Sequence, residues 1–177
     1  CKRAAELNDR LPAVYVTLGR IHSGTGKNDL ALQEFQHALS LSPKNPDALL
    51  GLAAVNETMG KTAEAEATFQ RAAALRPEYW DGYSKLALFY IRQRKYDQAL
   101  AQFRRALELS PDNAQTFMNL GTVYLYQDKP ADAEAAFKKS LEISSTYAAY
   151  ANLGVLYYNQ LRYAESAALT EQALKIN

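Results

Sequence analysis

The sequence repeats itself every 34 residues, and this periodicity constrains the fold more than any other feature. Pro43, Pro77 and Pro111 are each 34 residues apart. Other residue types keep the same spacing: phenylalanine at Phe35, Phe69, Phe103 and Phe137, alanine at Ala31, Ala65, Ala99 and Ala133, and Leu-Gly or Leu-Ala at 18–19, 52–53, 86–87 and 120–121. A further Leu-Gly follows one residue early, at 153–154. A fixed period of this length is typical of an array of stacked units rather than one globular core.

Each period predicts two antiparallel helices, called helix A and helix B below. The third period has apolar stripes at Tyr83, Leu86, Ala87 and Tyr90, and again at Ala99, Phe103, Ala106 and Leu107. The first stripe follows the spacing i, i+3, i+4, i+7 and the second the spacing i, i+4, i+7, i+8, and each spacing places its residues on one helix face. The polar stretch 92–95 separates the two stripes, so we expect the turn between helix A and helix B there.

The prolines mark where these helices begin and end. Pro12 and Pro46 suit the first turn of helix A, and Pro130 suits the first turn of a helix B, where a missing N–H costs nothing. Pro43 and its equivalents follow helix B and end it. Small residues such as Gly19 would let helices A and B approach closely, while the phenylalanines fill the groove toward the next repeat.

With each repeat numbered from its first residue, the pattern resembles the tetratricopeptide repeat. That family has a large residue at position 4, Leu-Gly or Leu-Ala at 7–8, an aromatic at 11, Ala at 20, Phe at 24, Ala at 27 and Pro at 32. Five repeats follow, at 12–45, 46–79, 80–113, 114–146 and 147–177, after residues 1–11, which resemble the tail of a preceding helix B. The resemblance implies one all-α array over 1–177, a right-handed superhelical solenoid of antiparallel helix pairs.

Several positions depart from the family pattern. His22 and Asn56 stand at position 11, where an aromatic residue is usual. Ser144 and Ser145 replace the proline turn of the fourth repeat, which is one residue short. The fifth repeat has Ser166 and Thr170 in place of Ala and Phe.

The ends of the sequence suggest a segment of a larger protein. There is no initiator Met, and Cys1-Lys-Arg aligns with Phe103-Arg-Arg inside a helix B. Arrays usually carry polar capping helices, and we expect none here. The stretch 76–83 resembles repeat regions of bacterial multidomain signalling proteins. We therefore expect a cytoplasmic location, with a parent protein that could be tethered to a membrane.

Composition argues against several classes of partner. The formal net charge is +1, which gives no reason to expect nucleic-acid binding. No apolar run approaches the roughly 20 residues of a membrane helix, so we expect no membrane insertion. One cysteine allows no intramolecular disulfide, which fits a reducing compartment.

We expect neither an enzyme nor a cofactor. The stretch 22–27 ends in Gly-Lys, but a phosphate loop needs glycine at 21, where Ile21 stands, and Ser or Thr at 28, where Asn28 stands. Two histidines and one cysteine do not make a zinc site, so no metal is expected. Glu64, Glu66 and Glu134 recur on helix B, and we expect them on its solvated face.

Helix A provides the candidate binding surface. If positions 4, 7, 8 and 11 are buried, positions 2, 6, 9 and 13 form a neighbouring stripe. The family resemblance implies that this stripe, with positions 5 and 12, lines a concave groove for a peptide. The candidate contact residues are Arg20, Lys85, Arg92, Asn119, Tyr126, Asn152, Tyr158 and Asn159.

Two alternatives stay open for these residues. Asn119 and Asn152 resemble the asparagine ladder of O-linked N-acetylglucosamine transferase, which would grip a peptide backbone, or they are only solvated. Lys85 and Arg92 form a positive spot for an acidic or C-terminal group, unless acidic neighbours such as Asp81 neutralise it. The residues do not match the clamp with which chaperone adaptors of this family bind a carboxylate.

The sequence therefore favours an interaction scaffold that binds an unidentified protein or peptide. The alternative is a homo-oligomer that stacks end to end through uncapped terminal repeats, whose apolar faces are exposed.

Overall fold

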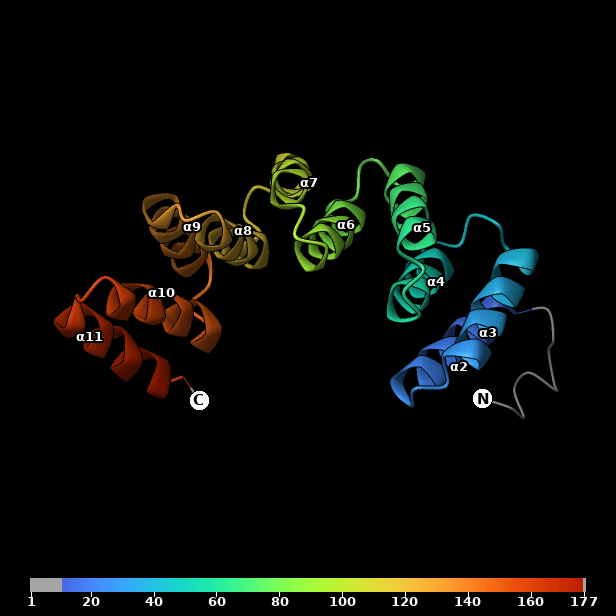
Figure 1. Ribbon diagram of the computed structural model, residues 1–177, viewed down its shortest axis with the longest axis horizontal. Coiled ribbons are helices and arrows are strands. Elements are labelled where there is room, and N and C mark those ends of the chain that lie inside the picture. Colours follow the sequence, from blue (N-terminus) through green and yellow to red (C-terminus); the bar gives the residue numbers. More distant parts are fainter. Residues whose placement is uncertain (1–10, 177) are drawn as a thin grey trace. The chain divides into compact units, whose positions relative to one another are not determined.

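The protein is all-α over residues 11–176, the part of the chain that this computed structural model describes (Figure 1). Ten helices follow in order: α2 (Pro12–Gly24), α3 (Asn28–Leu41), α4 (Pro46–Thr58), α5 (Thr62–Leu75), α6 (Trp80–Arg92), α7 (Tyr96–Leu109), α8 (Ala114–Tyr126), α9 (Pro130–Ile143), α10 (Tyr147–Asn159) and α11 (Tyr163–Leu174). The helix tail expected at 1–11 lies outside the described residues except for Leu11, the non-helical residue before α2.

The even-numbered helices are the A helices and the odd-numbered ones the B helices. Pro12, Pro46 and Pro130 stand in the first turn of α2, α4 and α9, as the sequence predicts. At the start of α4 and α8, the side chains of Asn45 and Asn113 accept hydrogen bonds from backbone N–H groups three residues later, at 3.0 and 2.9 Å. These N-caps satisfy one of the free donors at each helix start.

Every turn from helix A to helix B contains one residue in the left-handed region. It is position 15 of each repeat: Gly26, Gly60, Arg94, Asp128 and Leu161, with φ between 56° and 75°. The next residue donates its N–H back to the carbonyl of position 11, as in Lys61 to Asn56 at 2.8 Å. This is the Schellman arrangement that ends a helix by satisfying its last carbonyl groups.

The core follows the sequence pattern at positions 8, 20 and 24. Ala53, Ala65 and Phe103 are at most 3 % exposed, and so are their equivalents in most other repeats. The expected stripe of helix A omitted position 10, however. Val55, Phe89, Val123 and Leu156 hold this position and are no more than 3 % exposed. In α4, α8 and α10, position 10 is buried because the helix packs against the helix B of the preceding repeat as well as its own.

Glycine on helix A leaves room for the phenyl ring of helix B. A Cβ atom at Gly121 of α8 would lie 2.4 Å from the ring of Phe137 of α9. In the first repeats, the Phe35 ring contacts two A helices, because a Cβ at Gly19 would be 2.8 Å away and one at Gly51 2.3 Å away. The two helices of a repeat are therefore closer than side chains at these positions would permit.

The chain divides into two compact units, one ending at Leu86 and the other beginning at Ala87. The boundary falls within α6, and each unit is described by itself. In the first unit, α2 packs against α3, α3 against α4, and α4 against α5. In the second unit, α7 packs against α8 and each following helix against the next, up to α11.

The turn geometry predicts that Leu161→Gly stabilises the protein. Leucine in the left-handed region costs about 1–2 kcal/mol, and Leu161 is 71 % exposed, so it loses little packing. After the entropy cost of glycine, we expect a gain of about 0.5–1 kcal/mol in the free energy of unfolding, measured in urea.

The reverse change provides the control. A Cβ at Gly60 would meet no atom within 4 Å, so Gly60→Leu tests the backbone conformation alone and should destabilise by about 1 kcal/mol. Equal stability of both variants with the parent would contradict the role given to position 15.

Candidate functional site

Acidic neighbours pair with the candidate cations of the first unit. Arg20 of α2 lies 2.7 Å from Asp47 of α4, and the Lys85 ammonium lies 4.0 Å from Asp81 one helical turn earlier. All four side chains are about half exposed or more, so each pair contributes little to stability. The pairs nevertheless reduce the positive charge that Arg20 and Lys85 present to a ligand.

The asparagines of the second unit lie on α8 and α10. Asn119 and Asn152 are half-buried, and Asn159 is exposed at the end of α10. The Asn119 side-chain oxygen accepts a hydrogen bond from Gln115 at 3.2 Å, which fixes the orientation of this amide. The amide nitrogen of Asn119 is then the group that can donate a hydrogen bond to a ligand.

Two of the candidate residues, Arg92 and Tyr126, line one cavity of 440 Å³. Tyr126 is 57 % exposed, and its ring stacks on Tyr96 with centroids 5.3 Å apart and planes 16° apart. Ile91 and Arg94 complete the lining. Within residues 11–176, no acidic side chain lines this cavity, and Arg94 forms no ion pair. The arrangement offers a flat aromatic surface beside guanidinium groups, which suits an anionic peptide group.

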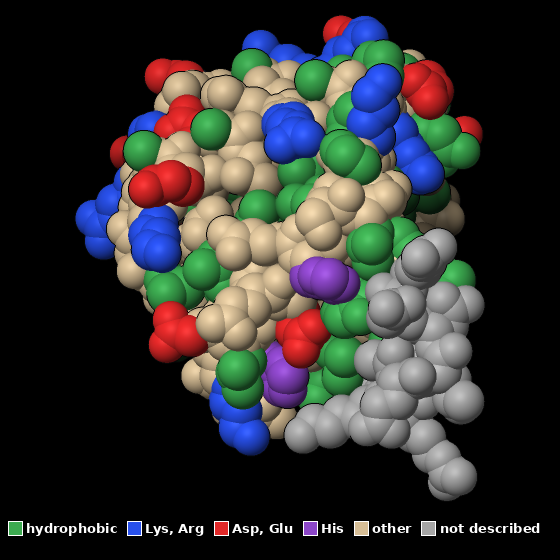
Figure 2. All heavy atoms as spheres, turned by 90° about the vertical axis from the view of Figure 1, so that its right-hand side faces the viewer, with side chains coloured by type: hydrophobic (Ala, Val, Ile, Leu, Met, Phe, Trp, Pro, Cys, Tyr) green, Lys and Arg blue, Asp and Glu red, His purple; other side chains and the backbone are tan. Residues whose placement is uncertain are grey.

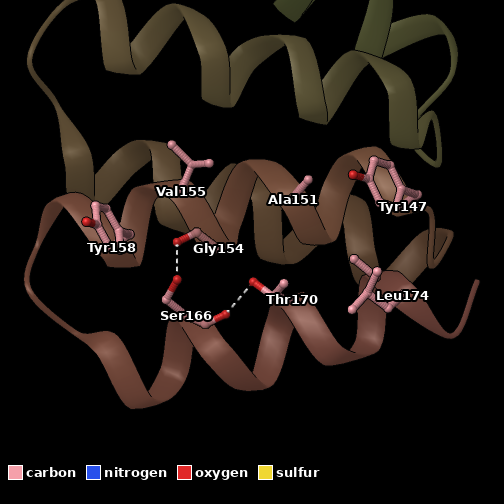
Figure 3. A pocket seen from close by; sticks show the side chains of 9 residues that line it. Tyr147, Ala151, Gly154, Val155, Tyr158, Ser166, Thr170 and Leu174 are labelled. Carbon is pink, nitrogen blue, oxygen red and sulfur yellow. Dashed lines mark hydrogen bonds between the residues drawn. The ribbon is translucent and has the colours of Figure 1, made fainter.

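Tyr158 lines a second cavity, of 290 Å³, between α10 and α11 (Figure 3). A second tyrosine, Tyr147, also lines it, and the other lining residues are aliphatic or small: Ala151, Gly154, Val155, Ser166, Thr170, Ala173 and Leu174. The rim is exposed, at 58 % for Val155, 61 % for Tyr158 and 68 % for Leu174. Tyr158 also contacts Tyr163 edge to face, with centroids 5.4 Å apart.

The substitution at position 24 of the fifth repeat explains this cavity. Ser166 and Thr170 stand at positions 20 and 24, where the fourth repeat has Ala133 and the buried ring of Phe137. A threonine cannot fill the volume of a phenyl ring, so space remains beside Gly154.

A polar cluster connects α9 to the turn between α10 and α11. The carboxylate of Glu134 accepts hydrogen bonds from Tyr157 and Arg162, both at 2.8 Å, and lies 2.7 Å from the Lys138 ammonium. Arg162 also lies 3.6 Å from the centroid of the Tyr157 ring and pairs with Glu165. The expectation that Glu134 lies on a solvated face is wrong, because its side chain is only 19 % exposed and holds two repeats together.

The ionisation of Glu134 reflects these contacts. Burial disfavours its charged form, but the hydrogen bonds from Lys138, Arg162 and Tyr157 outweigh this effect and lower its pKa from 4.5 to about 2. The carboxylate is therefore charged at neutral pH and stabilises the junction between the fourth and fifth repeats.

The two histidines differ in their surroundings, and the buried Nδ1 of His22 has no hydrogen-bond partner among the described residues. His22 is largely buried, with Nδ1 3.8 Å from Glu34, and His37 packs against Tyr15 at a centroid distance of 4.1 Å. Between residues 11 and 176, no three His, Cys, Asp or Glu side chains are placed to hold a metal ion. Nor is any helix in that range long and apolar enough to cross a bilayer. On the face shown in Figure 2, basic and acidic side chains are interspersed rather than gathered in one patch.

Sequence reasoning missed some of the residues that line the cavities. Tyr96 and Arg94 belong to positions 17 and 15, outside the stripe taken from helix A. Tyr147 and Leu174 were missed in the same way. The signal for the second cavity was present, since Ser166 and Thr170 break the repeat pattern at two core positions.

Family models agree with the repeat pattern. Three tetratricopeptide repeat models match residues 23–87, 81–146 and 118–177, and together they cover residues 23–177. No curated protein sequence matches the chain.

Solved structures of this repeat class superpose on the chain. Pseudomonas aeruginosa pilF has a TM-score of 0.83 and 24% identity, covering 96% of this chain and 78% of that one. A thermophilic TPR protein of Thermus thermophilus has a TM-score of 0.75 and 28% identity, covering 93% and 91%. YrrB, described as a TPR protein with an unusual peptide-binding site, has a TM-score of 0.65 and 21% identity, covering 99% and 91%. Identities this low show the shared fold and nothing about a shared ligand.

The Glu134 cluster predicts a specific pH dependence. A group whose pKa is lowered on folding stabilises the protein above its unfolded pKa, and this stabilisation is lost as the pH falls through the folded value. The difference in unfolding free energy between the parent and Glu134→Gln should therefore be largest above pH 4.5 and shrink toward pH 2. Urea unfolding at several pH values measures it.

Glu171→Gln is the matched control, because Glu171 is exposed on α11 and should contribute little to stability. A Glu134→Gln difference that stays constant from pH 7 to pH 2 would show that the charge of this carboxylate does not stabilise the junction.

Proposed function

Because the chain belongs to the tetratricopeptide repeat family, we propose that it is an interaction scaffold that binds an extended polypeptide segment along its A helices. The family and its fold support a protein-binding role in general. The finer assignment, to the A helices of the second unit, rests on the exposed aromatic and amide side chains found there.

The 440 Å³ cavity is the observation that carries this proposal. It places Arg92 and Tyr126, two residues chosen from the sequence as peptide contacts, beside Arg94 and Tyr96. Tyr126 exposes more than half of its surface although it stacks on Tyr96. A large aromatic surface held rigid by stacking costs little entropy to bind, which is typical of residues that anchor a ligand.

The cavity chemistry favours a peptide with an acidic group. Arg94 can form charge-assisted hydrogen bonds with a carboxylate, and the tyrosine rings can stack against a flat neighbouring side chain. Arg92 also interacts with another group of the protein, so the charge contribution is assigned to Arg94. Asn119 and Asn152 on α8 and α10 would then bond the backbone of the same segment, since an amide both donates and accepts.

A relative offers a precedent for peptide binding by this fold. The structure of YrrB is described as that of a TPR protein with an unusual peptide-binding site. By analogy, we propose that this scaffold also holds a peptide, at the cavity that Tyr96 and Arg94 line.

Head-to-tail self-association is a second candidate, favoured by one observation on α2. Ile21 stands at position 10 and is 47 % exposed, whereas every later residue at this position is buried. A helix B from another copy could cover it, as α3 covers Val55 within the first unit. Both ends of the chain would then form one heterologous interface.

Peptide binding predicts that Arg94→Gly weakens the affinity while the fold stays intact. The change removes the guanidinium but also relieves the left-handed backbone at φ 58°, so stability should rise rather than fall. For the best acidic peptide from a display library, we expect roughly a tenfold loss of affinity, about 1.4 kcal/mol, by fluorescence anisotropy.

Leu161→Gly is the control, since it makes the same backbone change in another turn and should leave affinity unchanged. Tyr126→Ala should weaken binding as Arg94→Gly does. If Arg94→Gly and Tyr126→Ala bind the selected peptide as tightly as the parent does, the proposed peptide site is wrong.

Self-association predicts a sedimentation coefficient that rises with protein concentration. Ile21→Lys would place a charge in the end-to-end interface and should return the chain to a monomer at every concentration. A parent chain that is monomeric at several hundred micromolar rules out this second candidate.

A further inference from the structure

The 440 Å³ cavity offers many hydrogen-bond donors and few acceptors. Its lining consists of Ile91, Arg92, Arg94, Tyr96 and Tyr126. A guanidinium group only donates, and an isoleucine side chain neither donates nor accepts. Within the described residues, the two tyrosine hydroxyls are therefore the only side-chain acceptors in this lining. A ligand bound here has to supply acceptors, and a buried N–H group of the ligand that finds no acceptor costs binding free energy.

The backbone carbonyl groups at the end of α6 are already engaged. The carbonyls of Phe89, Tyr90 and Ile91 each accept a hydrogen bond from an N–H group of the following turn, at 3.1, 2.9 and 2.9 Å. The carbonyls of residues 123–125, near the end of α8, are bonded in the same way. Helix C-termini usually leave carbonyl acceptors free, but the Schellman arrangement of these turns uses them.

Several side-chain oxygens near the cavity residues also have donors. Asp97 and Gln127 each follow a tyrosine of the cavity, and one oxygen of Asp97 accepts from the Gln127 amide at 2.8 Å. The side-chain oxygen of Gln127 accepts from Lys129 at 3.1 Å. On α8, the Asn119 oxygen accepts from Gln115, which leaves the Asn119 amide nitrogen to donate. The groups left to bind a ligand are therefore mainly donors.

The tyrosine pair supplies a flat apolar surface beside these donors. The rings of Tyr96 and Tyr126 stack with planes 16° apart, and Tyr126 is still 57 % exposed. Aromatic surfaces of this kind bind proline-rich segments, which are already ordered as a polyproline II helix. Proline is also the residue whose backbone has a carbonyl acceptor and no N–H donor. One residue type thus fits both the aromatic surface and the excess of donors.

The spacing along α8 suits the polyproline II conformation. Asn119 and Tyr126 are seven residues apart, which places them on the same helix face and about 10 Å apart along the axis. One turn of a polyproline II helix has three residues and a length of about 9 Å, so residues i and i+3 have the same orientation. In a β-strand, residue i+3 faces the opposite side from residue i.

We propose that this cavity binds a proline-rich segment in the polyproline II conformation, with one proline on the Tyr126 ring and an acidic side chain paired with Arg94. The inference rests on the proposed function, because it names the class of segment that occupies the same peptide site. Another kind of acidic peptide at this site would leave the proposed function intact and make the inference wrong.

Three labelled peptides test the inference by fluorescence anisotropy with the chain 1–177. The first has one glutamate between two runs of three prolines, the second has alanine in place of every proline, and the third has glutamine in place of glutamate. The first should bind about tenfold more tightly than the second, because it is already ordered and lacks N–H groups. It should also bind about tenfold more tightly than the third, which loses the charged partner of Arg94. Equal affinities of the first and second peptides overturn the inference.

Variants of the protein assign each preference to a residue, and circular dichroism checks that each variant is folded. Tyr126→Ala should abolish the preference for proline over alanine, whereas Tyr126→Phe keeps the ring and should retain it. Arg94→Gly should abolish only the preference for glutamate over glutamine. Tyr79→Ala is the matched control, since Tyr79 is 54 % exposed, lies outside the cavity lining, and should affect neither preference. A proline preference that survives Tyr126→Ala contradicts the site.

The acidic peptide selected from the display library separates this inference from the proposed function. If that peptide binds and Tyr126→Ala weakens it, while the proline-rich peptide does not bind, the peptide site is correct and the inference is wrong. If neither peptide binds, the proposed function fails together with the inference.

Discussion

The close approach of helix A to helix B is the constraint on which the repeats with phenylalanine at position 24 depend. It requires a residue without a bulky side chain where the phenyl ring of position 24 lies, and Gly19 and Gly121 meet this need. The face of helix B that is not in contact with its own helix A then packs against the A helix of the next repeat, as α3 does against α4. The exposed side chains of the A helices are therefore not needed for the packing that holds the repeats together.

Most of the fold could be predicted because its causes are local and recur. The prolines and the apolar stripes place the helices, and Phe137 repeats the role of Phe35 at the same spacing. Burial at position 10 was not predictable from one helix pair, since Val55 is buried by the preceding repeat. The role of Glu134 was missed for the same reason, because Arg162 and Tyr157, its partners, come from the next repeat.

The candidate site was predictable only in part. The stripe of helix A predicts Arg92 and Tyr126 as contact residues, but it cannot show that the ring of Tyr96 on helix B stacks on the ring of Tyr126. The sequence suggested that acidic neighbours such as Asp81 neutralise the cations, but it could not show that Asp47 pairs with Arg20 from another helix. The cavity beside Thr170 is different: its cause is a missing ring, which is visible in the sequence, although its shape and exposed rim are not.

The left-handed residue in each A-to-B turn has the same backbone conformation in every described repeat, although its side chain differs. Arg94, Asp128 and Leu161 adopt almost the same φ as Gly26 and Gly60, although one is cationic, one anionic and one aliphatic. The turn therefore keeps one backbone conformation in each repeat, whether the residue at position 15 is charged, apolar or glycine. A substitution there changes the exposed side chain and leaves the helices as they are. A family of such arrays could change its ligand preference by substitutions at this single position.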